Sequence, residues 1–122
     1  MTWEEIANEQ KRSCEILLAK RSEQLPRAAI SRAYYAVYAL LASRAPSSMV
    51  FPDGRQNPSH PQLISIIDQI PGIPKKLVKE AVRRLWHSRV IADYGIGLSV
   101  GTSDAKMRLR DCVFVFREVG LS

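Results

Sequence analysis

The sequence has few of the residues that build metal centres and disulfide frameworks. Among its 122 residues only two are cysteines and two are histidines, and no cysteine and histidine cluster has the spacing of a zinc site. Cys14 and Cys112 lie far apart in segments that both have helical patterns, so we expect a free buried thiol in each and no disulfide. This cysteine usage suits the cytosol, and we expect a cytoplasmic protein without a metal or cofactor.

Long apolar runs are also missing. No stretch approaches the roughly 18 consecutive apolar residues of a membrane-spanning helix. The start of the sequence, MTWEEIANEQKR, lacks the apolar core of a signal peptide. We therefore expect no membrane association.

Strand patterns are absent too, because no segment alternates strictly between apolar and polar residues. Five segments instead keep helical spacing, and capping residues, prolines and glycines mark their ends, with N-caps expected at Thr2, Ser59 and Thr102 and a glycine stop at Gly120. The expected helices cover about residues 2–25, 26–45, 59–70, 74–94 and 103–119, with a loop over residues 46–58. With 46% hydrophobic content the chain can bury a core, so the prediction is a single all-α domain over residues 1–122.

Acidic residues are outnumbered by basic ones, 12 to 18, which gives a net charge of +6 and a pI near 9.7. Such a charge favours polyanionic partners such as RNA, DNA, a nucleotide or an acidic protein. Part of it forms a basic run on the fourth predicted helix, made of Lys75, Lys76, Lys79, Arg83 and Arg84. A run of this kind is usually a solvated face, although it would give salt-dependent, sequence-independent affinity for phosphates.

The segment ISRAYYAVYALL, residues 30–41, holds three of the four tyrosines and a single charge, Arg32. One helical face carries Ile30, Ala33, Tyr34, Val37, Leu40 and Leu41 and can face the core of the protein. The opposite face, with Tyr35 and Tyr38, lacks the charges of a solvated surface. Two interpretations are open: a central helix covered by its neighbours, or a helix whose second face meets a second subunit.

Arg89 is unusual because its helical angle falls between Val78 and Val82, on the apolar side of the fourth predicted helix. Asp93 follows one turn later. Burying a guanidinium without a partner costs several kcal/mol. We therefore expect Arg89 to form an ion pair with Asp93, to reach a subunit boundary, or to face a cleft that binds an anion. His87 lies on the basic face, where we expect it to be solvated.

Three motifs follow one another along the chain: ISRAYYAVYALLAS, then SHPQLISII, then RVIADYG at the end of the basic helix. Together they resemble the HEPN domain superfamily, and most of all its small stand-alone prokaryotic members. The likeness extends from about residue 24 to 118. It implies an up-and-down bundle of four to five helices and a homodimer with a cleft at the interface. It also implies association with a minimal nucleotidyltransferase, often as a toxin and antitoxin pair, and in many relatives a metal-independent ribonuclease activity.

The ribonuclease signature of that family is an arginine followed, after four to six residues, by a histidine. Arg89 matches the arginine, but the histidine positions hold Tyr94, Gly95 and Ile96. Arginine is a poor general base, and tyrosine, with an ordinary pKa near 10, needs strong perturbation to serve as one. His60 begins the third predicted helix, where backbone amides favour anions, so it is either a site residue or a helix-start contact.

The first hypothesis is a HEPN-type homodimer that binds RNA or a nucleotide in its interfacial cleft, beside a nucleotidyltransferase partner. The expected lining is Arg32, Tyr35, His60, Arg89, Asp93 and Tyr94, with Tyr35 and Tyr38 at the dimer interface. Arg89 would contact phosphate and Asp93 would orient Arg89. One alternative is a ribonuclease toxin in which His60 or Tyr94 replaces the missing histidine. The other is a non-catalytic structural partner that the Arg89 and Asp93 pair stabilises.

Overall fold

The computed structural model describes residues 2–19, 25–49, 57–95 and 97–120. Within these ranges the chain forms five α-helices and no strand. The helices are α1 (Trp3–Ala19), α2 (Leu25–Ala42), α3 (His60–Gln69), α4 (Lys75–Tyr94) and α5 (Thr102–Val119). The all-α prediction is therefore confirmed.

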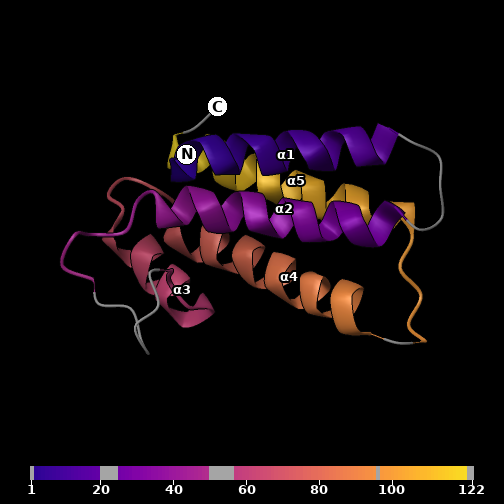
Figure 1. Ribbon diagram of the computed structural model, residues 1–122. Helices are drawn as coiled ribbons and strands as arrows, with labels where there is room; N and C mark the ends of the chain where they lie inside the picture. Colours follow the sequence, from indigo (N-terminus) through magenta and orange to yellow (C-terminus); the bar gives the residue numbers. More distant parts are fainter. Residues whose placement is uncertain (1, 20–24, 50–56, 96, 121–122) are drawn as a thin grey trace.

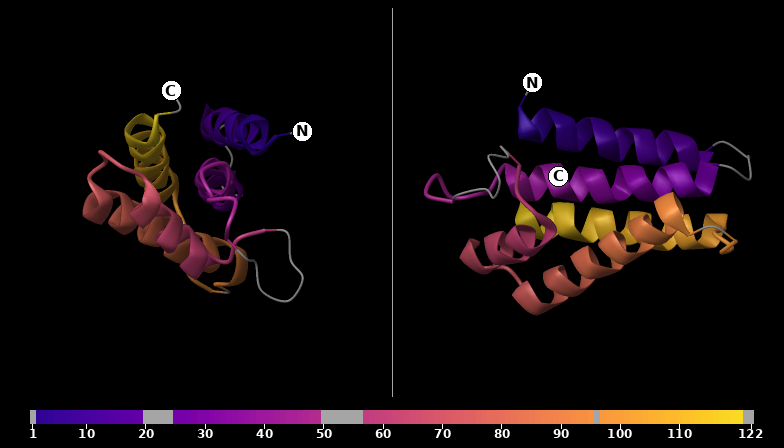
Figure 2. Two further views of the ribbon diagram at one scale, coloured as in Figure 1. Left: turned by 90° about the vertical axis from the view of Figure 1, so that its left-hand side faces the viewer. Right: turned by 60° about the horizontal axis from the view of Figure 1, so that its bottom comes forward.

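The four long helices, α1, α2, α4 and α5, alternate in direction, so the start of α1 and the end of α5 lie at the same end of the bundle (Figure 1). The short helix α3 lies at that end, beside the end of α2 and the start of α4 (Figures 1 and 2). This is the up-and-down arrangement that the HEPN resemblance implies. It places the SHPQLISII motif beside both α2, which carries three tyrosines, and α4, which carries the basic run.

Helix α2 is the centre of the bundle, since it contacts each of the other four helices (Figure 2). All six residues of its predicted core face are buried, and Ala39 and Ala42 on the opposite face are buried as well. The exposed residues of α2 form a narrow strip one turn apart: Ala28, Arg32 and Tyr35. Coverage by neighbouring helices thus explains most of the apolar character of α2. That a second subunit contacts the exposed strip stays a prediction.

The predicted caps place most helix ends correctly. The Thr2 hydroxyl accepts a hydrogen bond from the Glu5 amide at 3.1 Å. Ser59 and Gln62 form a reciprocal capping box, in which each side chain accepts from the backbone amide of the other, at 3.3 and 2.9 Å. Gly120, at φ 92°, adopts the left-handed conformation that ends α5.

Three predicted boundaries are wrong by a short distance. Leu25 begins α2, whereas the first helix was expected to end there, and α2 ends at Ala42, before the expected residue 45. Helix α5 begins at Thr102, not Ser103, and its cap is Gly101, whose amide donates to the Asp104 carboxylate at 2.9 Å. The Asp104 side chain, one turn into the helix, satisfies the amide of Gly101, and Thr102, expected to be the cap, is the first residue of the helix.

Arg27 of α2 fixes the end of α4. Its guanidinium donates to the carbonyls of Ile91 at 3.2 Å, Ala92 at 3.1 Å and Gly95 at 3.4 Å, and also to that of Leu98. The last carbonyls of a helix have no partner within the helix, so one side chain satisfies several of them at once. The last turn of α4 is therefore held against the start of α2.

Both cysteines are free and fully buried, as predicted. Burial, aided by the negative Glu15, raises the pKa of Cys14 to about 12, and burial also raises the pKa of Cys112. Across the described residues no group of three or more His, Cys, Asp or Glu side chains is placed to hold a metal ion. None of the described helices is both long and apolar enough to cross a bilayer.

Candidate functional site

Arg89 is the centre of a polar cluster between α2 and α4. Its Nη2 donates a hydrogen bond to the Tyr35 hydroxyl at 2.8 Å. Its Nε lies 2.9 Å from Asp93 Oδ2, an ion pair by distance whose direction is not that of a hydrogen bond. Asp93 in turn accepts a 2.5 Å hydrogen bond from the Ser31 hydroxyl of α2. The carboxylate thus bridges the two helices and fixes the position of the guanidinium.

Aromatic rings surround this guanidinium. Its central carbon lies 5.9 Å from the ring centroid of Tyr34, 5.4 Å from that of Tyr35 and 5.7 Å from that of Tyr94, all within the range of cation–π attraction. Burial alone would lower the pKa of Arg89, but the charges and hydroxyls of Tyr35, Asp93 and Tyr94 outweigh it and raise that pKa. Arg89 is therefore a permanent cation, and its side chain is 20% exposed.

His60 belongs to the same region through Tyr34. Its ring stacks on Trp86 of α4, with the centroids 4.6 Å apart and the planes 23° apart, and its Nδ1 lies 3.4 Å from the Tyr34 hydroxyl. Burial and, to a smaller extent, the nearby positive Arg83 lower the pKa of His60, which favours its neutral imidazole. The same hydroxyl-bearing ring of Tyr34 faces the Arg89 guanidinium.

We call this continuous group of side chains from α2, α3 and α4 the Arg89 site. Its members are Ser31, Tyr34, Tyr35, His60, Trp86, Arg89, Asp93 and Tyr94.

Most of the predicted site residues come together in this way. Tyr35, Arg89, Asp93 and Tyr94 are in direct contact, and His60 joins them through Tyr34. The prediction that Arg89 pairs with Asp93 is confirmed.

Two predicted residues have other partners. Arg32 is exposed and donates to Gln10 of α1 at 3.2 Å, on the side of α2 that faces α1. Tyr38 is partly buried: its hydroxyl donates to the Pro58 carbonyl at 2.7 Å and its ring packs edge-on against Trp3. Tyr35, by contrast, is 37% exposed and remains open to a partner.

Three members of the site were not identified from the sequence. Tyr34 was assigned to the core, and its ring is indeed buried, but its hydroxyl faces His60. Ser31 and Trp86 were given no role. Their spacing carries a signal, since Ser31 precedes Tyr35 by four residues and Trp86 precedes Arg89 by three, which places each pair on one helix face.

The basic run of α4 divides into two groups. Lys79 pairs with Asp68 of α3 and Arg84 pairs with Asp111 of α5. Lys75, Lys76 and Arg83 form no ion pair with any residue in the described ranges. Arg83 influences His60, so this free part of the basic run borders the Arg89 site. His87 is exposed, as predicted.

No family model, no curated protein and no solved structure matches this chain. The HEPN resemblance therefore rests on the three sequence motifs, and what it implies for function is a proposal.

Proposed function

We propose that this protein is a HEPN-type homodimer that binds RNA or a nucleotide at the Arg89 site, and that it acts beside a minimal nucleotidyltransferase in a toxin–antitoxin-like system. The observation that carries the binding part is the Arg89 guanidinium, held by Asp93 and Tyr35 among aromatic rings. Two of these rings face solvent, Tyr35 at 37% and Tyr94 at 69% exposure. A fixed cation beside open aromatic rings matches the two parts of a nucleotide.

The phosphate is the natural ligand of the guanidinium. Nη2 and Nε of Arg89 face Tyr35 and Asp93, whereas no residue in the described ranges accepts a hydrogen bond from Nη1. Arginine binds phosphate through its planar fork of donors, and charge-assisted bonds of this kind are the strong ones. Lys76 and Arg83, exposed on the same helix, supply further cations for a longer RNA backbone.

The base has a place as well. Stacking of a nucleic acid base on an aromatic side chain contributes about 1–3 kcal/mol and tolerates any sequence. Tyr94, the most exposed ring of the site, lies 5.7 Å from the Arg89 guanidinium. A nucleotide whose phosphate contacts Arg89 would therefore have a stacking surface within reach.

Binding is tested with a fluorescein-labelled single-stranded RNA and, separately, with a labelled adenine nucleotide, by fluorescence anisotropy. We expect Arg89→Ala to weaken binding at least tenfold, or about 1.4 kcal/mol. The matched control is Arg12→Ala, which removes the same charge from an exposed position of α1. Equal losses in the two variants would mean that affinity follows net charge alone, and the proposed site would be wrong.

One specific observation favours the ribonuclease alternative. His60 lies in the same site as Arg89, and its lowered pKa favours the neutral imidazole that a general base needs. In this alternative Arg89 stabilises the scissile phosphate, while His60 or Tyr94 transfers the proton. The test is cleavage of total RNA in the presence of EDTA by the wild type, Arg89→Ala and His60→Gln. Absence of cleavage by pure wild-type protein removes the alternative.

Dimerisation has a separate test. Tyr35→Asp places a charge on the exposed strip of α2, and we expect it to give monomers in sedimentation. The matched control is Met107→Asp on α5, where the methionine is 50% exposed. If the Tyr35→Asp variant remains a dimer, the placement of Tyr35 at the dimer interface is wrong. Tyr38→Asp should also give monomers, but it removes a hydrogen bond to Pro58 within the chain, so Tyr35 is the cleaner probe.

A further inference from the structure

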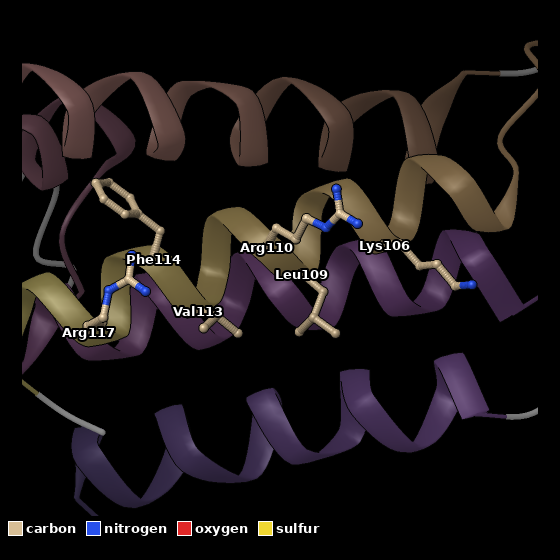
Figure 3. A pocket seen from close by; sticks show the side chains of 6 residues that line it. All are labelled: Lys106, Leu109, Arg110, Val113, Phe114 and Arg117. Atoms are coloured by element: carbon tan, nitrogen blue, oxygen red, sulfur yellow. The ribbon is translucent and has the colours of Figure 1, made fainter.

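The outer face of α5 carries an open groove that shares no residue with the Arg89 site. It has a volume of about 490 Å³. Six side chains of α5 line it (Figure 3), namely Lys106, Leu109, Arg110, Val113, Phe114 and Arg117. We call it the α5 groove.

The groove is one continuous helical stripe, because its residues recur every three to four positions. Its centre is apolar: Val113 is 42% exposed, and Leu109 and Phe114 are partly buried. In Figure 3, Leu109 and Val113 point toward α1, while Phe114 points toward α4. An apolar stripe of this length on an outward helix face is typical of a surface that another element covers.

The charges of the groove all have one sign. Lys106, Arg110 and Arg117 line it, and none of the described residues that line it is acidic. Within the described part of the chain, the acidic partner of Arg117 is Glu118, at 3.7 Å, and the guanidinium lies 5.8 Å from the centroid of the Phe114 ring. The partner of this groove must therefore combine apolar groups with negative charge.

A second hollow extends the groove toward α1. It has a volume of about 230 Å³, and Val113 and Arg117 line both hollows. Lys11 of α1 also lines it, 5.5 Å from the centroid of the Phe116 ring, and is paired with Glu15 of the same helix at 3.7 Å. The combined surface thus has an apolar centre, with cations on α5 and one ion-paired lysine on the α1 side.

We propose that the α5 groove is the docking surface for an acidic amphipathic helix of a partner protein. A second copy of this chain would bring two cationic stripes together, which is repulsive. RNA would use the cations but would gain nothing from the aliphatic side chains of Leu109 and Val113. A helix with apolar residues at helical spacing and glutamates or aspartates beside them uses both features. This proposal stands independently of nucleotide binding at the Arg89 site.

The test uses a labelled synthetic helix with leucines at positions i, i+3, i+4 and i+7 and glutamates on either side of them. One control peptide has the same composition in scrambled order, and another has lysine in place of glutamate. We expect the full-length protein to bind only the ordered acidic helix. Val113→Asp and the double variant Arg110→Glu with Arg117→Glu should each weaken binding roughly tenfold or more.

The matched control is Lys75→Glu with Lys76→Glu, which makes the same change in net charge on α4, and it should bind the helix normally. The proposal is overturned if the acidic helix does not bind, if the scrambled peptide binds equally well, or if the control double variant loses as much affinity. It is also overturned if a single-stranded RNA binds in place of the helix and loses affinity in Val113→Asp. Dimers that dissociate in Val113→Asp would assign the groove to a second copy instead.

Discussion

Helix α4 carries two arginine and aspartate clusters with different surroundings. In the first, Arg89 pairs with Asp93 on its own helix. In the second, Arg84 makes two parallel bonds to Asp111 of α5, from Nη2 to Oδ1 at 2.9 Å and from Nε to Oδ2 at 3.2 Å. Arg108 Nε also lies 3.2 Å from this carboxylate, so two arginines share one aspartate.

The difference shows how a structural cluster can be told from a candidate site. Asp111 is only 13% exposed, and its bonds to Arg84 join α5 to α4, which stabilises the packing of the bundle. Around Arg89 the partners include the hydroxyl of Tyr35, and exposed aromatic rings lie within cation–π distance. An ion pair alone is therefore no evidence of function, and the open rings beside it are what support a ligand.

The largest effect that separates the two clusters is expected for Asp111→Asn. The change leaves Arg84 and Arg108 close together without a counter-charge, so we expect the free energy of unfolding to fall by about 2–3 kcal/mol. Urea denaturation measures it. RNA affinity should not change.

The comparison variant is Arg89→Ala, for which we expect a fall of about 1 kcal/mol, because Asp93 is 28% exposed and solvent can take over part of its contacts. If Arg89→Ala instead costs several kcal/mol and leaves RNA affinity intact, both clusters are structural and the third hypothesis is correct.

The next effect concerns the support of the Arg89 site. Arg27→Met removes the hydrogen bonds to the last carbonyls of α4, so we expect a loss of about 1–2 kcal/mol in the free energy of unfolding. Amide hydrogen exchange should accelerate in the last turn of α4 more than at Arg84, and RNA affinity should fall. Arg12→Met is the matched control at an exposed position. Unchanged exchange in the last turn would show that Arg27 does not hold it.

A smaller effect compares single hydrogen bonds to the two clusters. Tyr35→Phe removes the bond to Arg89, and Ser88→Ala removes the 3.3 Å bond from Arg108 to the serine hydroxyl. Each should cost about 1 kcal/mol or less in the free energy of unfolding. Only Tyr35→Phe should lower the affinity for RNA in the anisotropy measurement. Equal affinities in the two variants would contradict a role for the Tyr35 hydroxyl in positioning Arg89.

Much of the fold and part of the site follow from local sequence. Helix ends were predictable where a cap acts over three or four residues, as at Ser59 and Gly120. The pairing of Arg89 with Asp93 was predictable for the same reason, since residues four apart share a helix face. The burial of α2 on nearly every side was indicated by the sequence, because residues 30–41 include a single charged residue, Arg32.

Contacts between helices were not predictable in this way. Tyr34, His60 and Trp86 come from three helices, and helical spacing says nothing about which faces meet. Arg32 was expected at the rim of the site, and only the position of α1 gives it Gln10 as a partner. The sharing of Asp111 by two arginines was not predicted, because Arg84 lies on α4 whereas Asp111 and Arg108 lie on α5.

The smallest predicted effect depends on pH and concerns only the Arg89 site. Burial and Arg83 lower the pKa of His60 below its ordinary value near 6.5. As the pH falls through about 6.5, the unfolded chain takes up a proton at this histidine before the folded chain does, so stability falls. The contribution of His60 to the free energy of unfolding is fully present above about pH 6.5, its ordinary pKa, and is lost as the pH falls through the lower pKa of the folded protein. Urea midpoints at pH 7.5 and 5.5 measure the difference.

His60→Gln should reduce this dependence on pH, whereas His87→Gln, at an exposed position of α4, should keep it. In the folded protein the imidazole stacks on Trp86 and contacts the Tyr34 hydroxyl, and a proton added to His60 must fit between these neighbours. A titrating group therefore lies within the Arg89 site, whereas the Asp111 cluster is built from arginines, an aspartate and a serine. If His60→Gln and the wild type lose the same stability between the two pH values, His60 is not the group that titrates, and its neutral form no longer supports the ribonuclease alternative.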